Sequence, residues 1–138
     1  MLASLFIGKI CFSLMKTKYI DIDENKWGVV LIYDFDMLDW DNMAAVMRAF
    51  GLKRNKVNYA IRVLSTYNSG LTISNPDLRM SVVFIGQPTS KSQFWNSVSH
   101  EMKHVTDAII EYYAKPCDGE SAAYLSGYLL QKVVEEFT

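Results

Sequence analysis

Hydrophobic residues recur along the chain either at alternate positions or in continuous runs, as in strands, or three and four positions apart, as in helices. Each change between these patterns marks the boundary of an expected element. Residues 27–35, WGVVLIYDF, are rich in β-branched and aromatic side chains, which indicates a strand. The segments GLTIS and LRMSVVFIG have the same character and flank a turn at residues 75–77. We therefore expect these two segments to pair as a β-hairpin.

Apolar residues three and four positions apart predict four helices. The first begins at Asp39, which is a suitable N-cap, and stops at Gly51. The others cover residues 53–67, 93–113 and 120–137. The apolar positions of the third helix are Trp95, Val98, Met102, Val105, Ile109 and Tyr112. This order predicts an α+β domain, in which a short β-sheet and two helices from the N-terminal half precede two C-terminal helices packed beside the sheet.

Length and composition indicate one globular domain spanning residues 1–138. The chain has 138 residues, of which 50% are hydrophobic and 21% charged. Its formal net charge is -1 and its lysines and arginines are scattered, so we expect neither a nucleic-acid partner nor an anionic membrane partner. The two cysteines, Cys11 and Cys117, form no disulfide framework and suit a reducing, cytoplasmic location.

The first fourteen residues, MLASLFIGKICFSL, are apolar but interrupted by Lys9. This stretch is too short to span a membrane, and no positively charged region precedes it as in a signal peptide. A start at Met15 would make residues 1–14 an upstream extension. No functional argument is therefore based on them.

Both histidines of the chain lie in one short stretch, SVSHEMKHVTDAI, within the third predicted helix. His100 and His104 are four positions apart, so their Cβ atoms are about 5–6 Å from each other on a helix face opposite the apolar stripe. Two imidazoles at that spacing can bind one zinc ion, and Glu101 can take a proton from a water on the metal. The pattern H-E-x-x-H therefore indicates a zinc site, and a solvated polar helix face is the alternative interpretation.

A catalytic zinc ion needs a third protein ligand and an open position for water. One large class of zinc peptidases has a third histidine ligand at the position that Ile110 occupies in this chain, so that class is excluded. The chain has no other histidine, so the third ligand must be a glutamate, an aspartate or a cysteine.

The stretch from residue 96 to 130 resembles a known family. HEMKH followed by ESAAY is similar to the gluzincin arrangement of HExxH zinc metallopeptidases, in which a glutamate on the next helix completes the zinc shell. More narrowly, D-x-E-x-x-A-Y-L-x-G-Y after the HExxH helix resembles short zincin-like proteins encoded by bacteriophages and mobile elements. The resemblance implies a small zincin-like domain in the cytoplasm of a bacterial host.

The resemblance also implies a role for each matching residue. His100 and His104 match the imidazole ligands, Glu101 the general base and Glu120 the carboxylate ligand. Tyr124, one turn after Glu120, would hydrogen-bond a zinc histidine or a developing oxyanion, or else simply pack between helices. Asp118 and Cys117 are the alternative third ligands.

In zincins an edge strand before the HExxH helix commonly pairs with an extended peptide substrate. SVVFIG, residues 81–86, would suit that role by resemblance, and is equally an ordinary core strand.

Together these observations predict a zinc-dependent metallopeptidase that hydrolyses peptide bonds through a zinc-activated water. Its partner would be a peptide or protein substrate, and the sequence does not give its oligomeric state. The alternative is a zinc-stabilised structural or interaction protein, such as a phage accessory factor, in which the zincin site is vestigial.

Overall fold

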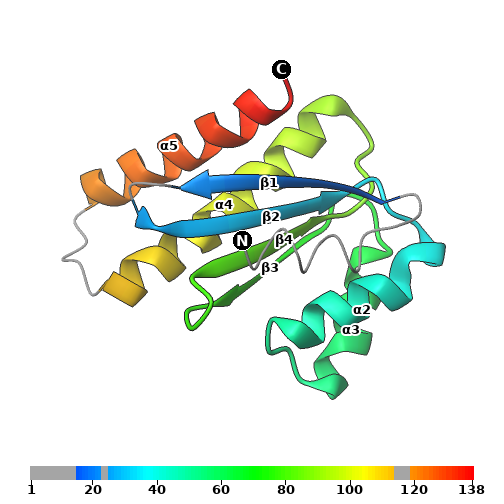
Figure 1. The fold of residues 1–138 in the computed structure, drawn as a ribbon. Helices are drawn as coiled ribbons and strands as arrows, with labels where there is room; N and C mark the ends of the chain where they lie inside the picture. Colours follow the sequence, from blue (N-terminus) through cyan, green and yellow to red (C-terminus); the bar gives the residue numbers. More distant parts are fainter. Residues whose placement is uncertain (1–14, 23–24, 114–118) are drawn as a thin grey trace.

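The computed structural model describes residues 15–22, 25–113 and 119–138, which form an α+β fold with helices on both faces of one sheet (Figure 1). The elements in chain order are β1 (Lys16–Ile22), β2 (Trp27–Tyr33), the 3-10 helix η2 (Met37–Asp39), α2 (Trp40–Ala49), α3 (Arg54–Leu64), β3 (Gly70–Asn75), β4 (Met80–Ile85), α4 (Lys91–Tyr113) and α5 (Gly119–Glu136). The predicted α+β class is confirmed.

The sheet is mixed, with its strands in the order β1-β2-β4-β3. β1 and β2 are antiparallel, β3 and β4 are antiparallel, and the two pairs join through the parallel contact between β2 and β4. The edge strands are therefore β1 and β3. β4 lies between β2 and β3, so the segment SVVFIG is a core strand and cannot pair with a substrate as an edge strand.

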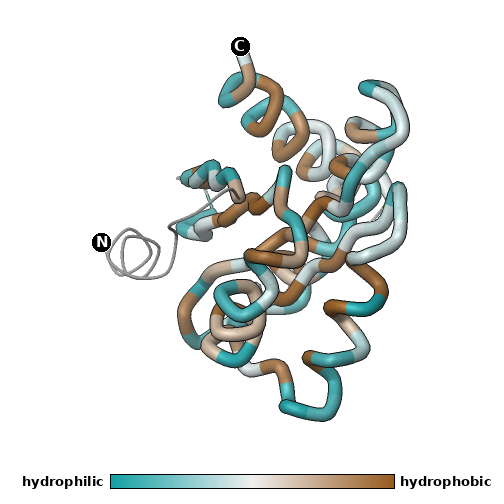
Figure 2. Tube along the Cα trace, turned by 90° about the vertical axis from the view of Figure 1, so that its right-hand side faces the viewer, coloured by the Kyte–Doolittle hydropathy of each residue, from teal (hydrophilic) through white to brown (hydrophobic). Residues whose placement is uncertain are grey.

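Alternate residues of the central strands enter two separate hydrophobic cores. Val30 and Ile32 of β2 face α2 and α3, whereas Val29 and Leu31 face α4 and α5. This alternation follows from the two-residue period of a strand, and a strand covered on both sides is apolar throughout. Figure 2 shows the hydrophobic stretches of the chain running through the middle of the molecule between the helices.

The edge strand β3 differs from β2 and β4, because only one of its faces is apolar. Leu71 and Ile73 pack against the core beneath α2 and α3. Gly70, Thr72 and Ser74 alternate with them and line the side next to α4. The face that β3 turns toward α4 is therefore made of small and polar residues, which leaves room beside the helix.

The four predicted helices and the hairpin of β3 and β4 are confirmed. β1 was not predicted, although Ile20 and Ile22 alternate with polar residues and are buried. Asp39 is the N-cap residue of α2, but its side chain makes no capping hydrogen bond to that helix. Instead, its carboxylate accepts a hydrogen bond at 3.0 Å from the backbone N–H of Asp36, which itself caps η2.

None of the helices in the described part of the chain is long and apolar enough to cross a membrane.

The packing of α5 on α4 can be tested at Leu129, whose side chain is fully buried among residues of α4, β1 and β2. We expect Leu129→Ala to lower the free energy of unfolding by about 2–5 kcal/mol, because it removes buried methyl groups and leaves a cavity. Urea denaturation with a fitted m-value measures this change. Val134→Ala, on the exposed side of the same helix, should change the free energy by less than about 0.5 kcal/mol. Equal effects of the two substitutions would contradict the observed packing.

Candidate functional site

α4 is the element that positions the candidate site. Pro88 precedes it, and the Ser90 hydroxyl accepts a hydrogen bond from the backbone N–H of Gln93 at 3.1 Å, as an N-cap does. Its apolar stripe is buried against the sheet and α5, with Val98, Met102, Val105 and Ile109 each no more than 1% exposed. This packing fixes the rotation of the helix about its axis, and thus the direction in which each polar residue points.

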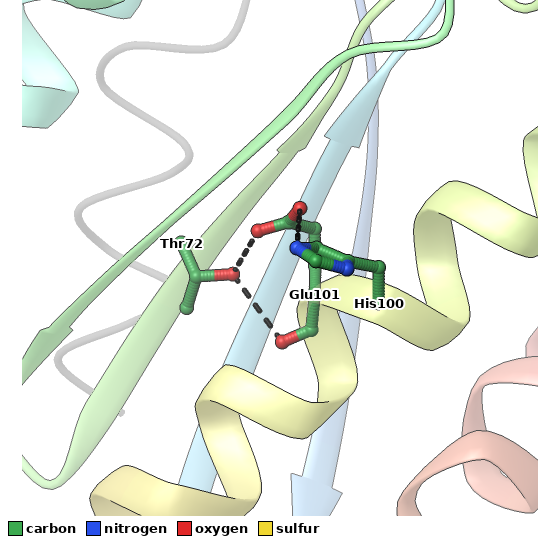
Figure 3. A network of polar contacts seen from close by, with 3 residues as sticks. All are labelled: Thr72, His100 and Glu101. Carbon is green, nitrogen blue, oxygen red and sulfur yellow. Dashed lines mark hydrogen bonds and ion pairs between the residues drawn. The ribbon is translucent and has the colours of Figure 1, made fainter.

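Glu101 is turned into the protein, between α4 and the edge strand β3. The residue is 5% exposed, which is rare for a carboxylate unless it is hydrogen-bonded. The Thr72 hydroxyl donates to Glu101 Oε1 at 2.8 Å and also lies 3.3 Å from the Glu101 carbonyl oxygen (Figure 3). The other carboxylate oxygen, Oε2, lies 4.0 Å from His100 Nε2. One oxygen is therefore held by the strand and the other faces His100.

Gly70 makes room for this carboxylate. A Cβ atom at position 70 would lie 2.6 Å from Glu101 Oε2 and 2.9 Å from Cδ and Cγ, which is closer than real Cβ contacts come. The absence of a side chain on Gly70 is therefore a requirement for the observed position of Glu101.

His100 and His104 lie on the solvent side of Glu101. Both residues are exposed, and the His100 side chain is 70% exposed. Their ring centroids are 5.1 Å apart at an interplanar angle of 76°, so the two rings are neighbours as the four-residue spacing predicts. Two adjacent imidazoles with a carboxylate beside them fit the donor chemistry of zinc.

His100, Glu101 and His104 line one cleft of about 400 Å³. One wall is β3, from Gly70 to Ser74, and the other is α4, from His100 to Glu111. Two further acidic residues of α4, Asp107 and Glu111, line the same cleft, and Asp107 Oδ1 forms an ion pair with Lys103 Nζ at 2.5 Å. The cleft is thus a polar hollow beside an edge strand, with both histidines and Glu101 in its wall.

The structure does not bring Glu120 or Tyr124 to the histidines. Both residues are exposed on α5 and line a different hollow, formed by residues 120–131 of that helix, and Tyr124 is 73% exposed. The reason is the position of α5, which contacts α4 and the edge strand β1 (Figure 1). The cleft is lined instead by α4 and by β3, the edge strand on the other side of the sheet. The predicted roles of Glu120 and Tyr124 stay predictions, and the observed geometry does not support them.

No group of three histidine, cysteine, aspartate or glutamate side chains suited to a metal is found in residues 15–22, 25–113 and 119–138. Within the described residues, two neighbouring imidazoles lie beside one carboxylate, and no group of three such side chains is arranged to hold a metal. The alternative third ligands, Asp118 and Cys117, lie outside the described residues.

Two residues of this site were missed by the sequence analysis, namely Gly70 and Thr72. The signal was the alternation in GLTIS, in which small and polar residues occupy one face and Leu71 and Ile73 the other. This alternation predicts a strand with one polar side, but it does not say which element faces that side.

Comparison with models of known families, with curated proteins and with solved structures gives no match.

The close contact between Gly70 and Glu101 can be tested with Gly70→Ala. We expect the new methyl group to displace the carboxylate and break its bond to Thr72, lowering the free energy of unfolding by about 1 kcal/mol. In a Glu101→Ala background the same substitution should cost little, because the clashing atoms are gone, so a double-mutant cycle by urea denaturation measures the coupling.

Gly127→Ala is a matched control. No atom lies within 4 Å of a Cβ built at this helical position, so alanine should stabilise α5 by about 0.5–1 kcal/mol. Equal costs of Gly70→Ala in the presence and absence of the Glu101 carboxylate would refute the contact.

Proposed function

We propose that this protein is a zinc-dependent peptidase in which His100 and His104 bind the metal and Glu101 acts as general base. The observation that supports the proposal is the placement of the Glu101 carboxylate in the wall of one cleft with both imidazoles. An HExxH sequence on an exposed helix would leave the glutamate in solvent. Here the glutamate is held between the helix and an edge strand, with one oxygen directed to His100.

The chain's own groups suit peptide hydrolysis. Zinc, when bound, makes a water molecule more acidic and polarises a carbonyl group. Glu101 Oε2 is the oxygen available to take the proton of the attacking water, because Thr72 holds Oε1. The same carboxyl group can then deliver that proton to the leaving amine. Water is thus split between a new carboxylate and a new amine, and the carboxylate of Glu101 is regenerated.

β3 is the part of the fold suited to bind an extended peptide. It pairs with β4 on one side and forms the edge of the sheet on the other, and its α4 side borders the cleft. A peptide can add to such an edge by main-chain hydrogen bonds, which bind a backbone whatever its side chains. The substrate strand of the proposed peptidase is therefore β3, in place of residues 81–86.

One observation favours the alternative of a zinc-stabilised or vestigial site. The Glu101 side chain is 6% exposed and accepts a hydrogen bond from Thr72, as a purely structural carboxylate would. In that case Glu101 serves to hold α4 against β3 and does not act as a base.

The zinc content of the protein and its turnover of peptides distinguish the peptidase from the structural alternative. We expect the purified protein to bind one equivalent of zinc, and His100→Ala and His104→Ala to lose it, because each removes one of two neighbouring ligands. Glu101→Gln should keep the zinc and lose at least about a hundredfold in turnover of unstructured peptides, because an amide cannot act as a base. Elemental analysis and a fluorogenic peptide assay measure the two effects.

Lys103→Ala is the control on the same helix. It removes an exposed side chain whose partner is Asp107, and it should change neither zinc content nor turnover. A protein that binds zinc and shows no peptide hydrolysis, with or without Glu101→Gln, would favour the structural alternative. A protein that binds no zinc would end both proposals.

The placement of α5 gives a separate prediction about Glu120. Because Glu120 lines a hollow distinct from the cleft of the histidines, we expect Glu120→Gln to leave zinc affinity within about twofold of the original value. Competition with a chromophoric chelator measures it, and Glu136→Gln at the other end of α5 is the control. A loss of tenfold or more with Glu120→Gln alone would show that Glu120 reaches the metal, as the resemblance implies.

A further inference from the structure

We infer that Thr72 is a positioning residue that sets the orientation of the Glu101 carboxylate for the substrate that β3 binds. The catalytic part of this inference rests on the proposed peptidase function. The structural part, that one hydroxyl group of the edge strand determines the rotamer of Glu101, can be tested without any activity.

Glu101 is confined from two sides by the same strand. Gly70 lies against Cγ, Cδ and Oε2, and the Thr72 hydroxyl donates to Oε1 at 2.8 Å. A glutamate side chain has three rotatable bonds, and holding it in one rotamer costs conformational entropy. The wall at Gly70 limits where the carboxylate can lie, and the hydrogen bond from Thr72 holds one oxygen so that the other faces His100.

No other hydroxyl on this face of β3 can replace that of Thr72. Ser74 is the next residue on the α4 side of β3, and its Oγ lies 2.6 Å from Ser81 Oγ. Ser81 in turn accepts a hydrogen bond at 3.0 Å from Trp27 Nε1, inside the core. The Ser74 hydroxyl therefore belongs to a network that leads away from Glu101.

The hydrogen bond from Thr72 also bears on how the base is aligned with a substrate. A general base must lie about 2.6–3.2 Å from the proton it takes, and a displacement of about 1 Å can cost a hundredfold in rate. In the proposed enzyme, the backbone of β3 aligns the peptide and the side chain of Thr72 aligns the base. Substrate and base are then both held by the same strand, which limits how far a shift of α4 against the sheet can separate them.

The test compares Thr72→Val, which keeps the shape of threonine without the hydroxyl, with Thr72→Ser, which keeps the hydroxyl. We expect Thr72→Val to lower kcat for a peptide substrate by about ten- to a hundredfold with KM within about twofold, because the base is misoriented while the strand edge is intact. Thr72→Ser should restore kcat to within about threefold. Thermal unfolding of each variant records any change in stability.

Thr106→Val is the matched control. Thr106 is buried, whereas Thr72 is half-buried, and the Thr106 hydroxyl donates to the Met102 carbonyl oxygen at 2.8 Å, on the same helix as Glu101. This variant loses one hydrogen-bonded hydroxyl, as Thr72→Val does, but no contact with Glu101. Its kcat should therefore be unchanged even if its stability falls.

The second readout is the side-chain rotamer of Glu101, measured by NMR from the three-bond couplings that report χ1 and χ2. We expect a single rotamer in the unaltered protein, in Thr72→Ser and in Thr106→Val, and averaging between rotamers in Thr72→Val. An unchanged single rotamer in Thr72→Val overturns the inference, as does a fall in kcat that Thr72→Ser fails to restore. Averaging in Thr72→Val together with no peptide hydrolysis by the unaltered protein supports the orienting role of Thr72 and refutes the peptidase proposal alone.

Discussion

A carboxylate inside a protein must find hydrogen-bond donors, and in this chain that requirement joins α4 to the edge strand β3. Glu101 is 5% exposed, and the Thr72 hydroxyl donates to it from β3. The contact needs a glycine at position 70, because any Cβ there would meet the carboxylate. It also needs the apolar stripe of α4, which holds the helix at the rotation that turns Glu101 inward. The placement of both histidines beside the cleft follows from that rotation.

The same rotation explains why the polar residues of α4 separate into two groups. Glu101 is next to the buried stripe and faces β3, whereas His100 and His104 are one residue before it and three after it, and point outward. The small residues on one side of β3 leave a hollow in front of them. α5 covers the other side of α4, toward β1. The helix thus has one flank that supports the fold and another that borders an open cleft.

Much of this fold could be predicted because the helices and the inner strands have strong hydrophobic periods. β1 was harder, since Lys16 and Lys18 break its apolar pattern and the strand is half exposed at the sheet edge. The contact of Thr72 with Glu101 could not be predicted, because it depends on the strand order and on how α4 packs across the sheet. The side of α4 on which Glu120 lies depends on the docking of α5, which no local pattern reveals.

The strand order also has a consequence for how the protein folds. Short connections join β1 to β2 and β3 to β4. Gly28 of β2, by contrast, pairs with Met80 of β4, and the segment that contains α2, α3 and β3 lies between these two residues in the chain. Closing so long a loop costs entropy before any contact compensates for it, so local hairpins precede distant pairings. Every residue that lines the cleft lies between Gly70 and Glu111, on the later hairpin and the helix that follows it. The lining of the cleft is therefore local in the chain, whereas the packing that fixes the rotation of α4 is complete only when β2 and α5 have joined the same core.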